Sequence, residues 1–254
     1  MRNRTFASAV PVGSAGKTTL TNYVMAAYAP NPAVLSVESA TPAGNEIELF
    51  ERSDASMILA LKARLIAPDS ERTLIVDAGV TDSELVAQAL MDLSKLRPLA
   101  HVTVVMPVMT DKKGATGLER YAPTLPDSVR RVAVLSQVED YAAHEAFLAS
   151  DRGKAVSAFC DTHGVELCPV PLLYCPLLDT SSAHHALLNG CGLSDVAELD
   201  IDAMVEDMRK KRGNRDIQKR VGLALDGIGM AKAALANTSA VYDFIAGGPE
   251  ATSG

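Results

Sequence analysis

Short apolar runs rich in β-branched residues recur along the first two thirds of the 254-residue chain, separated by segments of helical length. Several runs are apolar almost throughout, which is typical of parallel strands buried on both faces. Alternating strands and helices predict right-handed crossovers and a three-layer α/β fold, with helices on both faces of a mostly parallel sheet. The predicted strands are Thr5–Val10, Ala33–Val37, Thr73–Ala78, His101–Pro107, Val132–Leu135 and Val165–Leu172.

The segments between these runs carry apolar residues at helical spacing. One such row, before the third predicted strand, is Met57, Leu61 and Leu65. After that strand the tetrapeptide T-D-S-E predicts a capping box with Thr81 as the N-cap and Glu84 three residues on. The row that follows it is Leu85, Ala89, Leu93 and Leu96.

No strand is predicted after Leu173, and the tail from about residue 193 is predicted to be helical. We expect one domain over residues 1–246, with a helical C-terminal segment and a flexible end at 247–254. The apolar face predicted for the last helix consists of Ile217, Val221, Leu225, Ile228 and Leu235.

No run of about 18 apolar residues exists, so we expect no membrane span, and the N-terminus lacks the pattern of a signal peptide. We therefore expect a cytoplasmic protein. The four cysteines form no C-x-x-C pair, which predicts buried thiols in a reducing compartment. A zinc site built from Cys160, His163, His184 and His185 is the alternative, although their spacing fits no standard template.

The first predicted strand runs directly into PVGSAGKTT, residues 11–19. This segment matches the end of the phosphate-loop pattern GxxxxGK[ST] and has Pro11 where the first glycine belongs. Glycines let backbone N–H groups approach a phosphate, and the following helix adds the positive end of its dipole. A turn that binds nothing is the alternative. The residues predicted to bind a nucleotide here are Gly13, Ser14, Ala15, Gly16, Lys17, Thr18 and Thr19.

Within this loop, Lys17 is predicted to reach the β- and γ-phosphates and Thr18 to place its hydroxyl on Mg²⁺. The third strand ends in LIVD, so Asp77 is expected at the carboxyl edge of the sheet, where open α/β sheets bind ligands. We predict that Asp77 supports the Mg²⁺ ion, the alternative being that it only begins the turn at Gly79.

The segment GSAGKTT resembles the deviant phosphate loop KGGxGKT of the ParA/MinD-type ATPases, which act as nucleotide-dependent dimers that position DNA and protein complexes. The signature lysine of that class would fall at Val12. The segment that resembles their D-x-D-P-Q-G-N switch keeps Pro42, Gly44 and Asn45, but the acid that positions water would fall at Thr41. Glu38 lies nearby and could partly substitute for that acid. The candidate catalytic residues are therefore Lys17 and Glu38.

The chain is more similar to the StbB-type plasmid stability proteins, a divergent branch of that class. The similarity rests on GKTT, the Val37-Glu38-Ser39 segment, IVDAG at 75–79, a V-x-P-V strand end followed by Lys112 and Lys113, and a last helix. The matching residues of that helix are Ala233, Asn237, Val241, Asp243 and Ile245. The resemblance implies an ATP- and Mg²⁺-dependent protein of plasmid inheritance or conjugative transfer, working as a homodimer with a small DNA-binding partner.

The departures at Val12 and Thr41 predict slow hydrolysis, with a turnover well below about 1 per second, or none. Gln137, after the fifth strand, stands where relatives carry an asparagine that reads the base, although it could equally start a helix. Pro169 and Pro171 belong to the loop expected over the base. The absence of the GTPase motif NKxD favours ATP.

The net charge of −7 conceals one basic segment, RKKRGNRDIQKR at 209–220. Without it, 17 basic and 30 acidic residues remain, a net charge of −13. The segment is a solvated helix face, a non-specific DNA contact or a docking site for an acidic partner. Its basic residues are Arg209, Lys210, Lys211, Arg212, Arg215, Lys219 and Arg220.

Three functions fit these features. The first is a nucleotide-driven switch that ties plasmid DNA to a cellular location. The second is a non-hydrolysing nucleotide-binding scaffold for a DNA-binding partner. The third is a phosphate-loop small-molecule kinase, for which no acid–base pair or acceptor motif stands out.

Overall fold

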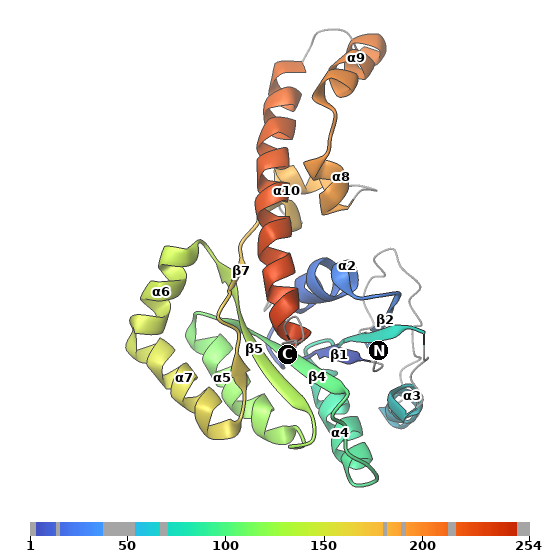
Figure 1. Ribbon diagram of the computed structural model, residues 1–254, viewed down its shortest axis with the longest axis vertical. Helices are drawn as coiled ribbons and strands as arrows, with labels where there is room; N and C mark the ends of the chain where they lie inside the picture. The colour runs from blue at the N-terminus through green and yellow to red at the C-terminus, as the bar shows by residue number, and fades with distance from the viewer. Residues whose placement is uncertain are drawn as a thin grey trace, which may run out of the picture.

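The computed structural model describes residues 4–13, 16–37, 54–66, 71–179, 182–188, 192–212 and 217–247. Within these ranges a seven-stranded sheet forms the centre, in the order β2-β3-β1-β4-β5-β6, with β7 also paired to β5 (Figure 1). Every pairing is parallel. The strands are β1 (Thr5–Ser8), β2 (Pro32–Ser36), β3 (Thr73–Asp77), β4 (Val102–Met109), β5 (Arg130–Val138), β6 (Glu166–Leu167) and β7 (Leu172–Leu173).

The strand predictions are confirmed for the first five runs, with shifted ends. The sixth run differs, because it forms two short strands, β6 and β7, instead of one. Pro169 and Pro171 lie between them, and proline has no N–H to donate to a ladder. Cys168, just before these prolines, still donates its N–H to the carbonyl of Ala133 at 2.8 Å.

Two separate apolar layers cover the sheet. Helices α3, α4, α5 and α7 pack on one face against side chains such as Ala7, Val76 and Val104. The helical stretch after β1 and the end of α10 pack on the other face against Phe6 and Ile75. This is the three-layer α/β architecture predicted from the sequence.

The helices are α1 (Lys17–Thr19), η1 (Leu20–Met25), α2 (Ala26–Tyr28), α3 (Asp54–Ile66), α4 (Ser83–Ser94), α5 (Lys112–Tyr121), η2 (Ala122–Thr124), α6 (Tyr141–Ala149), α7 (Asp151–His163), η3 (Pro176–Leu178), η4 (Ala183–Leu188), α8 (Leu193–Ala197), α9 (Ile201–Arg212) and α10 (Ile217–Ile245).

The capping box predicted at Thr81 is wrong. Helix α4 begins at Ser83, and its N-cap is Asp82, whose side chain makes no capping hydrogen bond. Ser83 already closes a turn onto Gly79, since both its N–H and its hydroxyl donate to that carbonyl. Glu84 therefore lies one position too early to reach back to the N-cap.

The tail forms a helical arm. Helices α8, α9 and the first half of α10 extend away from the sheet, whereas the second half of α10 lies against it (Figure 1). Arg4 donates to the carbonyl of Ala246, and Arg130 donates to those of Phe244 and Ile245. Cations near the last carbonyls of a helix satisfy and stabilise its C-terminus. The lower end of α10 is thus fixed to the sheet.

The apolar face predicted for α10 is correct only in part, because Val221, Ile228 and Leu235 are half-buried but Leu225 is not. Leu225 is 55% exposed, and the buried face follows a row of small residues, Ala224, Gly227, Ala231 and Ala234. A Cβ added at Gly227 would lie 2.4 Å from Leu187 Cδ1, so the missing side chain lets the arm pack closely. The small residues let this half of α10 approach the arm closely, while Met230 and Leu235 pack at the edge of the same cluster.

Candidate nucleotide site

The predicted phosphate loop leaves the carboxyl end of β1, the strand between β3 and β4. Ser8, the last residue of β1, is opposite Asp77 on β3 and Val105 on β4. Gly16 ends the loop as the N-cap of α1 with a φ of 89°, a left-handed conformation that glycine adopts without strain. The loop therefore opens at the sheet edge where α/β proteins bind ligands, directly before a helix N-terminus.

The Lys17 side chain folds back over its own loop. It is only 8% exposed, and its Nζ donates to the carbonyls of Val10 at 3.1 Å and Val12 at 2.8 Å. A buried ammonium is costly unless hydrogen bonds satisfy it. The loop thus holds a positive charge between its own carbonyls.

Asp77 lies where a metal-supporting acid was predicted. It is the last residue of β3, 9% exposed, and beside the end of β1 in the strand register. Thr18 is exposed and Thr19 is half-buried, while Gly13 lies on the loop near Val80. The predicted residues Ser14, Ala15 and Glu38 lie outside the described residues, as do Thr41, Pro42, Gly44 and Asn45.

Val12 packs into the protein at the position where the resemblance places a signature lysine. It is half-buried and belongs to the rim of the apolar layer on the α5 face of the sheet. A Cβ added at Gly117 of α5 would lie 2.2 Å from Val12 Cγ2. Gly117 therefore makes room for Val12, and this contact ties the phosphate loop to α5.

Gln137 lies in β5 and not at a helix start, so that alternative is wrong. Helix α6 begins at Tyr141, and its N-cap Asp140 accepts the N–H of Ala143 at 2.7 Å. Gln137 is exposed, has a φ of 58°, and lies where the β5–β7 register shifts. Its neighbour Ser136 has its Cβ 3.6 Å from the position of a Cβ at Gly16. The end of β5 therefore adjoins the phosphate loop.

Two exposed tyrosines near this strand end were not predicted from the sequence. Tyr141 is 52% exposed and Tyr174 is 47% exposed, in a chain with 4% aromatic residues. Tyr174 follows β7, and its N–H donates to the carbonyl of Val138 at 2.7 Å. Both lie after the ends of neighbouring strands, and the sequence signal that could have found them is an aromatic residue shortly after each predicted strand.

No family model matches this chain. No curated protein matches it either. Among solved structures, it is similar to apo McdA from Cyanothece, with 15% identity, 90% of this chain and 100% of that chain covered, and a TM-score of 0.49. It is also similar to an ATP complex of a Cyanothece McdA variant, with 16% identity, coverages of 90% and 97%, and a TM-score of 0.45. Because both TM-scores lie below 0.5, the fold assignment rests on this chain's own strand order and register.

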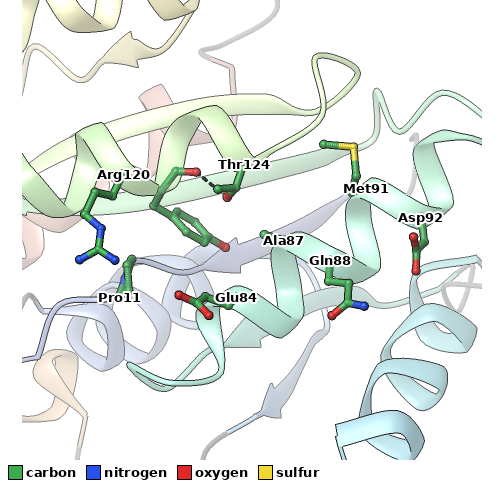
Figure 2. A pocket seen from close by; sticks show the side chains of 9 residues that line it. Pro11, Glu84, Ala87, Gln88, Met91, Asp92, Arg120 and Thr124 are labelled. Carbon is green, nitrogen blue, oxygen red and sulfur yellow. Dashed lines mark hydrogen bonds between the residues drawn. The ribbon is translucent and has the colours of Figure 1, made fainter.

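A groove of 450 Å³ lies behind the phosphate loop, between α4 and α5 (Figure 2). Pro11 at the start of the loop reaches one end of it, near Glu84 and Arg120. The lining residues of the groove are Pro11, Glu84, Ala87, Gln88, Met91, Asp92, Arg120, Tyr121 and Thr124.

The described residues of the basic segment lie at the tip of the arm, where α9 ends and α10 begins (Figure 1). Lys219 and Arg220 are exposed, and Lys210 pairs with Glu206 at 2.7 Å. Arg209, Lys211 and Arg212 are in α9 by their backbone, and Arg215 lies outside the described residues. Helix α9 ends at Arg212 and α10 begins at Ile217, so the described residues of this segment belong to two helices.

The described residues supply no zinc site and no membrane span. No cluster of three or more His, Cys, Asp or Glu side chains within them could hold a metal ion. Burial raises the pKa of the Cys160 and Cys168 thiols to about 11, as expected of buried cysteines. None of the described helices is both long and apolar enough to cross a membrane.

Proposed function

We propose that the chain is an Mg–ATP-binding switch protein of the ParA/MinD-like class. One observation carries this proposal: Asp77 ends β3 beside the carboxyl end of β1, and the loop that follows β1 brings the buried Lys17 to a helix N-terminus opened by Gly16. This set of groups suits a nucleotide phosphate and its metal ion. Lys17 would hold the phosphates, and Thr18 and Asp77 would hold Mg²⁺, which would neutralise phosphate charge.

We further propose a role in plasmid inheritance or conjugative transfer, in the manner of the StbB-type proteins. On this proposal the protein is cytoplasmic, forms a homodimer and works with a small DNA-binding partner. Hydrolysis is slow or absent, because Val12 is packed against Gly117 and offers no charge to a phosphate. A non-hydrolysing scaffold is the second candidate. The exposed arm outside the nucleotide site favours it as a surface for a partner.

Plasmid retention with Lys17→Ala separates the switch from the scaffold. A switch needs the nucleotide, so we expect plasmid loss in the variant to match that of a deletion of the gene. The measurement is the fraction of cells that keep the plasmid without selection over successive generations, with protein levels matched to wild type. Wild-type retention by a variant that no longer binds ATP would rule out the switch and leave the scaffold.

We propose that the arm tip contacts DNA through phosphate charge. Lys219 and Arg220 are exposed at the start of α10 and carry no ion pair in the described residues. Affinity for a random duplex should therefore fall steeply between about 50 and 200 mM salt. The double variant Lys219→Ala/Arg220→Ala should lower the slope of log affinity against log salt by about 2 units.

The matched control is Lys232→Ala, an exposed lysine farther along the same helix. It should leave the salt slope unchanged, because it lies about three turns from the tip. Binding that is equal at both salt concentrations would remove the DNA contact and favour a solvated helix face. Binding to an acidic protein that depends on the same two residues would favour the partner-docking alternative.

A further inference from the structure

Asn237 is a buried polar residue that joins α10 to two other segments of the chain. It is 5% exposed, and its Oδ1 accepts the N–H of Leu173 at 3.0 Å. Its Nδ2 donates to the carbonyl of Pro171 at 2.8 Å and lies 3.4 Å from the hydroxyl oxygen of Tyr141, as a second donation. Both ends of one amide are thus used, which is the arrangement that makes a buried amide stabilising rather than costly.

Pro171, Leu173 and Tyr141, which Asn237 holds, lie at β7 and the carboxyl end of β5. We call this group of residues the β7 wall. Leu173 is opposite Val138 in the sheet, and Tyr174 donates its N–H to that same residue. One residue before Val138 is the exposed Gln137, and Ser136 adjoins Gly16 of the phosphate loop. A ligand with its phosphates at Gly16 and its remaining part toward β5 would therefore meet the segment that Asn237 positions.

The same helix carries the basic tip at its other end. Helix α10 is continuous over Ile217–Ile245, and Lys219 and Arg220 lie in its first turn. Below Asn237, Arg130 holds its last carbonyls, and beside it Thr238 bonds the hydroxyl of Tyr28 at 3.0 Å. Asn237 therefore lies in the half of α10 that is fixed to the sheet.

We propose that Asn237 is a positioning residue for the base side of the nucleotide site. The inference rests on the proposed function, because it assumes that the phosphate loop binds a nucleotide. Asn237 acts through the backbone of Pro171 and Leu173 and through Tyr141, and not by touching the ligand itself.

The test compares Mg–ATP with Mg–tripolyphosphate, which shares the phosphates but has no base or ribose. In Asn237→Ala we expect the affinity for ATP to fall about tenfold and that for tripolyphosphate to change less than about twofold. The measurement is titration calorimetry on the full chain. A merely structural asparagine would weaken both ligands together, since it would act through the stability of the whole site.

Two further variants make the result decisive. Asn237→Asp keeps an acceptor for Leu173 but places a carboxylate oxygen against the Pro171 carbonyl, so it should show the same ATP-selective loss. It also replaces Asn237→Ala if the alanine variant does not fold. Thr238→Val is the matched control, because it removes a buried hydroxyl from the next position of α10 without touching the wall. We expect it to leave the ratio of the two affinities unchanged.

The outcomes separate this inference from the proposed function. If the wild type binds both ligands and the Asn237 variants lose both in parallel, or lose neither, the positioning role is overturned while the nucleotide site stands. If the wild type binds neither ligand, the proposed function fails and the positioning role fails with it. An ATP-selective loss in both Asn237 variants, absent in Thr238→Val, supports the positioning role.

Discussion

Replacing Lys17 with alanine is expected to lower the affinity for Mg–ATP at least about hundredfold, which corresponds to about 2.7 kcal/mol. The reason is local charge. The Lys17 ammonium is buried and held by the carbonyls of Val10 and Val12, so it lies in the loop that would enclose the phosphates. Charge-assisted hydrogen bonds to phosphate are strong, and no second lysine stands at Val12 to compensate.

Thermal unfolding with and without Mg–ATP reads out this loss. At a ligand concentration of about 100 times Kd, the wild type should gain about 2.7 kcal/mol of stability, and Lys17→Ala should gain almost none. The variant also loses two hydrogen bonds to the loop, so each protein is compared with its own ligand-free state. Lys154→Ala, an exposed lysine on α7, is the control and should respond like the wild type. An equal gain in Lys17→Ala would contradict the assigned role.

Replacing Gly117 with alanine is expected to disturb the phosphate loop from behind. The new Cβ would lie 2.2 Å from Val12 Cγ2 and 3.4 Å from Val10 Cγ2, so the loop has to move. Overpacking of this kind costs about 1–3 kcal/mol, against a gain of about 1 kcal/mol in helix propensity. We expect a net loss of stability and, because the displaced residues border Lys17, weaker Mg–ATP binding.

A double-mutant cycle isolates this contact. Val12→Ala removes the methyl group that clashes, so Val12→Ala/Gly117→Ala should recover most of what Gly117→Ala loses. The expected coupling free energy is about 1 kcal/mol or more, measured by denaturant unfolding. Gly229→Ala on α10 is the control, because a Cβ there meets nothing within 4 Å. It should stabilise slightly, and additive losses at 12 and 117 would refute the proposed packing.

The sheet and the loop were predictable because their signals are local. Buried parallel strands require continuous β-branched runs, and a phosphate loop requires glycines and a lysine between a strand and a helix. The residues that make up each pattern lie close together in the chain. Asp77 followed from the same logic, since it directly ends an apolar strand.

The parts that escaped prediction depend on contacts between distant residues. Gly227 and the neighbouring alanines of α10 pack against the arm, and no local pattern distinguishes this face from the larger apolar residues predicted to face inward. The wall beside Gln137 joins β5 and β7 to α10, a helix far along the chain, through Asn237. In the sequence, Val12 only marks the position where the signature lysine is missing. In the structure it packs against Gly117, and no local pattern predicts that contact.

The most direct test of the nucleotide switch is a calorimetric titration of the wild-type chain with ATP, in the presence and absence of Mg²⁺. The site built from Lys17, Thr18 and Asp77 predicts saturable binding in which Mg²⁺ strengthens the affinity, because the ion would share the phosphate charge with these side chains. Absence of binding at millimolar ATP with Mg²⁺ present would contradict the central claim that this phosphate loop holds a nucleotide.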